Sequence, residues 1–535
     1  MLGNAEILDT TLRDGRQIKT TRVHTLEDVL GVVKAIDSLG LVDYIEAGFA
    51  GADASIDIAI KEAARLKLNA RIAAFGRVRA PNSKVNDLKN NYGIKSLLDV
   101  ETPAVVLVYK AWDYQVPSII GVDLEENLRM IEDTVRFFVG EGKEVIADAE
   151  FATAAFLGNP HENIKPGLDY LLITSETALN AGARKAVLCD TTGILMPHQV
   201  GEFIALFASA FGNDRIGFHG HNDHGFADAN TFLAVKAGAT HSQTTFTGTG
   251  ERCGNASTAV LAGNLSSPYQ TNPVTVDLNR LKPVGEYVHI VLTGSTLPDN
   301  FPFIGNSAFR HIGGMHADGN QKLQNAYNGR RPEDFGNSEK YPITLQSGTA
   351  HIAQALGVNK RDPWVRLVYD ESMRLLKEGY PLSDYPEFFE VIAARLKPDY
   401  VSPFKILSTH LSEDSVDGER VDKARISVSF GGDEPVTLSH RCLGQVDAVI
   451  EPLKSELGII YGLPKFKFEY EVHGYLGEGS ARKVIVKAPF IVQNGAVPKV
   501  YTMIGISHSV IGASIDAITA GIEYALMLKE RQKQK

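Results

Sequence analysis

The sequence predicts an α/β protein in which a TIM (β/α)8 barrel precedes a helical connector and a C-terminal α+β domain. Residues 5–265 alternate short β-branched runs with longer helical patterns eight times, as successive strand–helix units do. The first strand is not followed by the glycine-rich turn that binds dinucleotides in open, doubly wound sheets. Beyond residue 420, two similar strand-then-helix segments indicate a duplicated strand-strand-helix unit.

Eight parallel strands within about 260 residues fit a closed barrel better than an open sheet. The helices between them carry start signals: Asp123 precedes a pattern with an acidic first turn, and Pro197 stands where a helix can begin. The predicted strands span residues 6–9, 42–47, 70–75, 104–109, 144–148, 185–189, 215–219 and 241–246.

The connector is marked by Pro and Gly breaks, a polar loop at 325–341, and helical patterns at 348–357, 364–378 and 386–396. The segments that begin at 424 and 481 each lead into one amphipathic helix, although two such helices can also resemble each other by chance. We therefore expect a catalytic barrel at 1–270, a helical linker and lid at 271–418, and a regulatory or dimerisation domain at 419–535.

Charge and cysteine content exclude several classes of protein. The net charge is −10 and no long basic run is present, so general binding to nucleic acid or to an anionic membrane has no electrostatic basis. Three widely spaced cysteines do not form the framework of a small secreted protein, which favours a reducing cytoplasm. We find no basic leader at the N-terminus and no run of about 18 apolar residues, so we expect no membrane span.

Polar motifs follow three of the predicted strands, at the barrel end where TIM-barrel enzymes hold their reacting groups. Arg13 and Asp14 follow the first strand, and His219 and His221 share one face at the end of the seventh. A glycine-rich turn after the eighth strand can bring the Asn255 amide back over the barrel mouth. A His-x-His pair alone is more often a hydrogen-bonded strand pair. Together with Asp14 on the adjoining strand, it favours a divalent metal site for Mg²⁺, Mn²⁺ or Zn²⁺.

Further candidates stand at other strand ends and in the connector. Glu150 is a candidate acid or base at the rim, and Thr191 can donate a hydroxyl to a substrate carboxylate; a buried polar layer explains either residue equally well. His316 lies between glycines, as in a mobile lid, although an isolated histidine there often only faces solvent. Phe75 and Tyr109, at strand ends, would narrow the cavity and favour a small substrate side chain.

Residues 9–17, 219–223 and 248–255 resemble signatures of the 2-isopropylmalate, homocitrate and citramalate synthases, a family of metal-dependent barrel acyltransferases. The likeness extends over nearly the whole chain. It is strongest to the bacterial citramalate synthases, through residues 110–113, 148–150, 307–316 and 505–514. The resemblance implies that acetyl-CoA is condensed with a 2-oxo acid, pyruvate above all, in isoleucine biosynthesis. It also implies a homodimer with feedback inhibition by isoleucine or leucine.

Carried over position by position, the resemblance implies roles for nine residues. Metal ligation falls to Asp14, His219, His221 and Asn255. Contact with the 2-oxo acid falls to Arg13 and Thr191, and further catalytic roles fall to Glu150, His316 and Tyr327. The chain departs from the family at Arg16, where Glu, Ala or Asn is usual; this guanidinium could contact coenzyme A phosphates or a second carboxylate, or point into solvent.

Other functions remain open on sequence alone. A 2-isopropylmalate synthase would use 2-oxoisovalerate, and a lyase or aldolase on the same barrel would break a carbon–carbon bond. The loop at 251–255 and the long C-terminal extension argue against the lyase, and no Met-Lys-Met segment is present to carry biotin in a carboxylase. A catalytically dead amino-acid sensor would not need the intact ligand set.

Overall fold

The structure, a computed structural model, describes residues 5–18, 24–81, 83, 85–311, 314–339, 343–345, 347–416, 419–442, 444–461, 466–468, 471–476, 483–492 and 498–533. The chain forms two units, each of which is described by itself. The first comprises Met1–Leu297, Pro302–Ile304 and Glu333–Asn337, and the second comprises Pro298–Phe301, Gly305–Pro332 and Ser338–Lys535.

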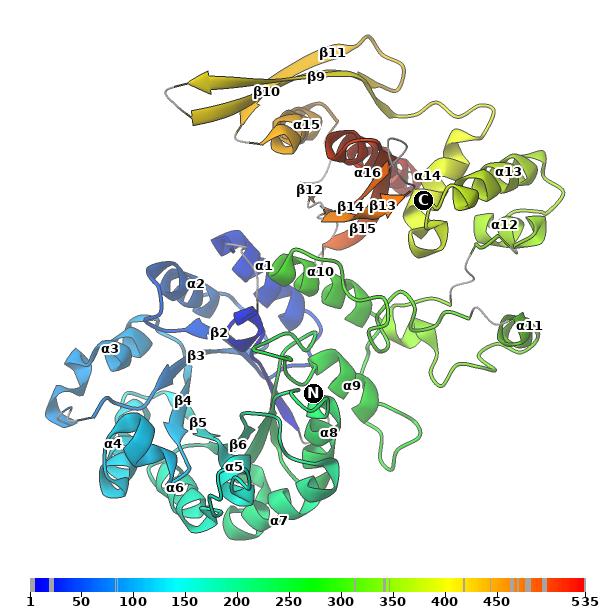
Figure 1. The fold of residues 1–535 in the computed structure, drawn as a ribbon. Coiled ribbons are helices and arrows are strands. Elements are labelled where there is room, and N and C mark those ends of the chain that lie inside the picture. The colour runs from blue at the N-terminus through cyan, green and yellow to red at the C-terminus, as the bar shows by residue number, and fades with distance from the viewer. Residues whose placement is uncertain are drawn as a thin grey trace. The chain divides into compact units, whose positions relative to one another are not determined.

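The first unit is a closed barrel of eight strands that pair in chain order, all parallel, with β1 beside β8 (Figure 1). This confirms the predicted fold class. The strands are β1 (Glu6–Asp9), β2 (Tyr44–Phe49), β3 (Arg71–Arg77), β4 (Ala104–Lys110), β5 (Glu144–Glu150), β6 (Lys185–Asp190), β7 (Ile216–Gly220) and β8 (His241–Thr244). Strand β8 ends two residues before the predicted end, because Thr245 already donates its backbone N–H to Ala256 in the following loop.

Helices surround the barrel and connect its strands (Figure 1). They are α1 (Leu26–Asp37), α2 (Ala54–Ala64), α3 (Tyr92–Asp99), α4 (Leu124–Gly140), α5 (Ala152–Leu157), α6 (Leu168–Asn180), α7 (Val200–Phe211), α8 (Ala227–Ala237), α9 (Thr258–Leu265) and α10 (Leu281–Thr293). Short helical turns are η1 (Asp14–Arg16), η2 (Val85–Asn90), η3 (Val116–Ile120), η4 (Pro197–Gln199) and η5 (Asn213–Arg215). The Asp123 carboxylate caps α4 by accepting from the N–H of Glu126, and Pro197 opens η4, which leads directly into α7.

The barrel interior is filled by every second residue of its strands, as the alternation of side chains along a strand requires. Its apolar part comprises Leu8, Tyr44, Ala73, Phe75, Ala104, Val106, Ile146, Val187 and Cys189. Continuing the same alternation toward the carboxyl ends places polar residues above this cluster. A layer of polar side chains, which we call the polar floor, therefore separates the apolar barrel core from the carboxyl-terminal mouth.

The second unit contains the connector helices and two antiparallel sheets. Its first helices are α11 (Gly314–Lys322), α12 (Thr349–Leu356), α13 (Pro363–Lys377) and α14 (Pro386–Arg395), with the turns η6 (Pro332–Phe335, mostly in the first unit) and η7 (Leu382–Asp384). The predicted helices at 348–357, 364–378 and 386–396 are therefore present, and α11 is an addition that the sequence did not single out.

The predicted duplication appears as two runs of strands, each followed by one helix. The first is β9 (Phe404–Val416), β10 (Glu419–Phe430), β11 (Val436–Cys442) and α15 (Gln445–Tyr461). The second is β12 (Phe466–Phe468), β13 (Glu471–Leu476), β14 (Lys483–Val492), β15 (Lys499–Ser507) and α16 (Val510–Lys533). Strand β10 pairs with β9 and β11, whereas β14 pairs with β12, β13 and β15.

Among the described helices, α16 alone is long and apolar enough, by length and composition, to be compared with a membrane span. Its apolar stretch is 61% buried, and Ala517, Ile518 and Ile522 belong to a core shared with β10, β14, β15 and α15. This burial is typical of the core helix of a folded domain.

Candidate active site

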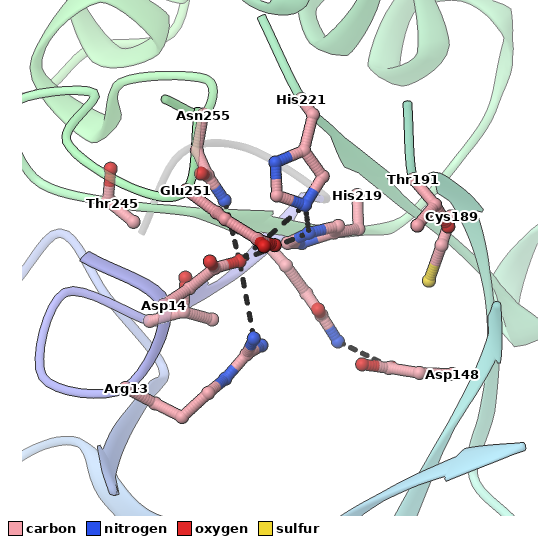
Figure 2. Close-up of polar contacts among 12 residues, drawn as sticks. Arg13, Asp14, Asp148, Cys189, Thr191, His219, His221, Thr245, Glu251 and Asn255 are labelled. Carbon is pink, nitrogen blue, oxygen red and sulfur yellow. Dashed lines mark hydrogen bonds and ion pairs between the residues drawn. The ribbon is translucent and has the colours of Figure 1, made fainter. Parts of the chain in front are cut away.

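Asp14, His219, His221 and Asn255 converge at the carboxyl-terminal mouth of the barrel, as predicted (Figure 2). The Nε2 atoms of the two histidines lie 3.2 Å apart, and they lie 3.4 and 3.8 Å from Oδ2 of Asp14. The Asn255 amide donates to the same oxygen at 2.8 Å. Bonds of about 2.0–2.6 Å to one divalent ion separate its ligand atoms by about 3–4 Å, so this spacing fits a single cation.

Buried polar atoms without a partner support the same interpretation. Within the described residues, Oδ1 of Asp14 and Oδ1 of Asn255 are buried and accept no hydrogen bond. Burying such oxygens unpaired is costly, and both are ligand types that hard divalent cations take. The donor set, two imidazoles with carboxylate and amide oxygens, therefore fits a divalent metal ion.

The charge states also suit metal binding. Burial by itself would raise the pKa of Asp14, but the Arg13 guanidinium and His219 overcome it and hold that pKa far below its usual value. Burial, together with His219, lowers the pKa of His221 to about 4. Near neutral pH the site thus presents a carboxylate and a neutral imidazole, the forms that ligate metals.

Arg13 is fixed beside the ligand cluster by two neighbours. Its Nε donates to Glu46 of β2 at 2.7 Å, and its guanidinium lies 4.2 Å from the centre of the Phe75 ring. A further nitrogen lies 3.2 Å from Asp14. Glu46 is fully buried, and the sequence reasoning missed it; a lone carboxylate within the apolar run of β2 was the available signal.

Arg252 joins the loops that follow β6, β7 and β8. Its guanidinium makes two contacts with the Asp223 carboxylate, at 2.7 and 3.1 Å, and donates to the backbone oxygen of Thr191. In the same loop, a Cβ at Gly250 would collide with Oδ1 of Asn255. The predicted return of the Asn255 amide over the mouth is thus present, and it depends on a glycine.

Polar contacts link the ends of β4, β5 and β6. Lys110 on β4 pairs with Glu150 on β5 at 2.5 Å. The next residue, Phe151, adopts a left-handed backbone conformation (φ 62°), which costs about 1–2 kcal/mol for a residue with a side chain. Its N–H donates at 2.8 Å to the hydroxyl of Thr191, the residue directly after β6. Thr191 therefore uses a lone pair on the backbone and keeps its O–H hydrogen for another acceptor.

Asp148 lies deeper than Glu150 on the same face of β5 and completes the polar floor. Gln243 of β8 donates to it at 2.7 Å, across the barrel interior. Burial raises the pKa of Asp148 to about 7. The sequence placed Asp148 below the rim, which the structure agrees with, but gave it no partner.

Tyr109 requires a correction. Ala104 and Val106 of β4 belong to the interior cluster, so the alternation of the strand turns Tyr109 outward, toward Ser175 and Thr174 of α6. The expectation that Tyr109 narrows the substrate cavity rested on its position in the sequence, which does not reveal the face of a strand. Phe75, by contrast, faces the interior.

His316 and Tyr327 belong to the second unit. His316 lies on α11, and its ring stacks on that of Tyr327 with centroids 4.4 Å apart. Both side chains are exposed. The predicted pair is therefore together in space, on a surface that another molecule can reach.

Comparison with known proteins agrees with this geometry. A model of the HMGL-like family matches residues 4–288. An (R)-citramalate synthase of Aquifex aeolicus is 31% identical to the chain, over 98% of the chain and 98% of that protein. The chain belongs to the HMGL-like family. An (R)-citramalate synthase of Synechocystis sp. is 30% identical over 98% of the chain and 96% of its own length. A homocitrate synthase of Sulfolobus acidocaldarius is 30% identical but covers 70% of the chain. As a member of the family, the chain aligns with citramalate synthases through the barrel and through both strand-then-helix segments beyond it.

Proposed function

We propose that the protein condenses acetyl-CoA with pyruvate to give citramalate and free coenzyme A. The observation that carries the proposal is the buried cluster of Asp14, His219, His221 and Asn255 beside Arg13. The full-length similarity to citramalate synthases supports pyruvate as the acceptor, since the homocitrate synthases align over a smaller part of the chain.

The four ligand residues would hold a divalent ion, which acts as a Lewis acid on the carbonyl group of a bound 2-oxo acid. Arg13, held by Glu46, is placed to stabilise negative charge that develops on the carbonyl oxygen. The free O–H of Thr191 would donate to the substrate carboxylate. These residues thus bind the 2-oxo acid in one orientation.

Acetyl-CoA must lose a methyl proton before its carbon can attack. We assign this proton to the His316 imidazole, whose ring stacks on that of Tyr327, and we assign to Glu150 the orientation of water. The resulting enolate carbon forms the new bond with the carbonyl carbon, whose oxygen takes up a proton. Water then cleaves the thioester, which releases coenzyme A as the thiol.

The ligand cluster is tested by substituting one member. His221→Ala should abolish thiol release from acetyl-CoA and lower the bound metal, measured by elemental analysis after dialysis. An exposed histidine outside the cluster, His161→Ala, serves as the matched control and should keep both. Unchanged turnover of His221→Ala at full metal content would contradict the mechanism.

Acceptor choice is tested by comparing kcat/KM for pyruvate, 2-oxoisovalerate and 2-oxoglutarate. Phe75, packed on Arg13, should favour the small methyl group, although one or two methylene groups are worth only about 1–3 kcal/mol. A preference for 2-oxoisovalerate would instead identify a 2-isopropylmalate synthase. A chain that binds metal and coenzyme A but turns over none of these acids would be a sensor.

We further propose a homodimer in the cytoplasm that is inhibited by isoleucine or leucine through residues 419–535. The paired strand-then-helix segments support a separate regulatory domain, with residues 271–418 as linker and lid. Sedimentation of the full chain and its rate with either amino acid test this assignment. A monomer whose rate neither amino acid changes would contradict it.

A further inference from the structure

The exposed pair of His316 and Tyr327 meets on one face of α11, at a position that a glycine leaves open. Gly319 follows His316 by three residues, so the two lie on the same face of the helix. A Cβ at Gly319 would collide with the ring of Tyr327. The Tyr327 ring therefore packs against the helix backbone there and stacks on the His316 imidazole, with ring planes 26° apart.

A buried asparagine holds the backbone of Tyr327. Asn320 is 4% exposed and uses both ends of its amide. Its oxygen accepts the N–H of Tyr327 at 2.7 Å, and its nitrogen donates to the Glu339 carboxylate. An ionised carboxylate can only accept, so Glu339 keeps the amide nitrogen on its own side and the amide oxygen toward Tyr327.

Glu339 also lies beside His311, which precedes α11. Nε2 of His311 lies 3.8 Å from the Glu339 carboxylate and 2.8 Å from Oδ1 of Asn328, the residue after Tyr327. Because an amide oxygen can only accept, this contact requires a hydrogen on Nε2. The His311 ring stands edge-on to that of His316, with centroids 6.4 Å apart. Glu339 thus reaches both members of the exposed pair through one intermediate residue each.

The supporting side chains are more sheltered than the pair that they support. The side chains of His311 and Glu339 are 12% and 17% exposed, whereas Tyr327 is 47% exposed. Functional side chains keep a productive geometry when sheltered neighbours fix them by hydrogen bonds in this way. The arrangement is therefore suited to presenting two rings to another molecule in one fixed orientation.

We propose that Glu339 is a positioning residue that holds Tyr327 and His316 in their stacked arrangement, through Asn320 and His311. The inference rests on the proposed function, in which the His316 imidazole removes a methyl proton from acetyl-CoA. A base without a fixed position spends less time within reach of that proton, so its loss of support lowers kcat. Binding of the 2-oxo acid, which we assign to barrel residues, is left unchanged.

The positioning itself is tested by hydrogen exchange of peptides that contain Tyr327, measured by mass spectrometry on the full chain. Glu339→Ala removes the acceptor for Asn320 and should speed this exchange at least fivefold. Glu339→Gln keeps an acceptor oxygen and should stay within twofold of the parent. Glu333→Ala, at an exposed glutamate six residues earlier, is the matched control and should exchange like the parent.

The consequence for catalysis is measured with acetyl-CoA and its trideuterated form. Glu339→Ala should lower kcat at least tenfold, keep KM for pyruvate within twofold, and raise the deuterium isotope effect on kcat, because proton removal becomes the slowest step. Glu339→Gln should keep most of the rate. A variant that merely unfolds more easily would lose active protein without any change in the isotope effect.

Asn328→Ala breaks only the link from His311 and provides a second, milder variant. It should show the same changes to a smaller extent. Exchange equal to the parent in Glu339→Ala and Asn328→Ala would overturn the proposal, as would faster exchange with an unchanged kcat and isotope effect. A parent chain that does not turn over acetyl-CoA with pyruvate would contradict the proposed function, and the exchange measurement would then decide the positioning by itself.

Discussion

The Thr191 hydroxyl accepts one hydrogen bond and can donate another. It accepts from the Phe151 N–H, which supports a left-handed residue directly after Glu150, and its own hydrogen remains for a substrate. The substitution Thr191→Val removes both interactions, whereas Thr191→Ser keeps both. If Thr191 donates to the substrate as proposed, this hydroxyl would couple the backbone conformation after Glu150 to substrate binding.

We predict that Thr191→Val weakens binding of the 2-oxo acid. A hydrogen bond to a charged group contributes about 1.5–3 kcal/mol, so KM for pyruvate should rise about tenfold or more. Thr191→Ser should stay near the parent value in steady-state assays at saturating acetyl-CoA. Equal KM values for the valine variant and the parent would show that the hydroxyl does not contact the substrate.

Asp148 makes stability depend on pH in the metal-free protein. Its pKa is about 7 in the folded chain, above the 3.8 of an ordinary aspartate, so the folded state holds the proton more tightly. The stabilising contribution is complete below pH 4 and is lost as the pH rises through 7. One pKa unit corresponds to about 1.4 kcal/mol, so the loss reaches about 4 kcal/mol at most.

The substitution Asp148→Asn should remove this dependence and keep an acceptor for Gln243. In urea unfolding with EDTA present, the stability of Asp148→Asn relative to the parent should increase between pH 4 and pH 8. Asp113→Asn, at a half-buried carboxylate outside the barrel interior, is the control. A relative stability that stays constant across this range would show that Asp148 is ionised throughout.

At the scale of secondary-structure elements, a side chain at the end of one strand fixes a candidate functional side chain at the end of the neighbouring strand. Lys110 on β4 fixes Glu150 on β5, and its ammonium also lies 5.1 Å from the centre of the Phe151 ring. Lys110 does not belong to the ligand cluster, so we expect it to act through Glu150, as a positioning residue.

We predict that Lys110→Met lowers kcat about tenfold with little change in KM for pyruvate. The reason is that Glu150 loses the cation that fixes its rotamer, whereas the groups that bind the 2-oxo acid are untouched. Lys110→Arg should restore most of the rate. A variant in which KM rises and kcat stays constant would instead place Lys110 in substrate binding.

The positions of helices and strands were more predictable from the sequence than the face of the strand on which a given side chain lies. The barrel strands follow from β-branched runs, and Asp14, His219 and His221 follow from the rule that strand ends meet at one mouth. Tyr109 was misplaced because the apolar run of β4 is buried on both faces and carries no alternation that reveals the interior. The pairing of Glu46 with Arg13 joins residues 33 positions apart, and no local pattern announces it.

At the scale of the whole molecule, the two units have separate cores. The barrel interior and the core of both C-terminal sheets share no residue. The four residues that would hold the proposed ion all belong to the first unit. A ligand stabilises the state that binds it, by about 2.7 kcal/mol at a concentration one hundred times its dissociation constant.

We predict two thermal transitions in calorimetry, of which Mn²⁺ raises one by several degrees. The shifted transition should belong to the barrel, because ion binding stabilises that unit. His221→Ala should lose the shift while keeping both transitions in EDTA. A single transition, or an equal shift of both, would show that the units unfold together.

The pairing of β1 with β8 has a consequence for how the chain matures. Asp14 follows the first strand, whereas the two imidazoles and the amide arrive only with the last two. A nascent chain synthesised only as far as about residue 200 contains Asp14 but none of the other three ligands, so it cannot form this metal site. A complete set of ligands would exist only after β8 pairs with β1 and closes the barrel. Metal uptake would therefore report barrel closure.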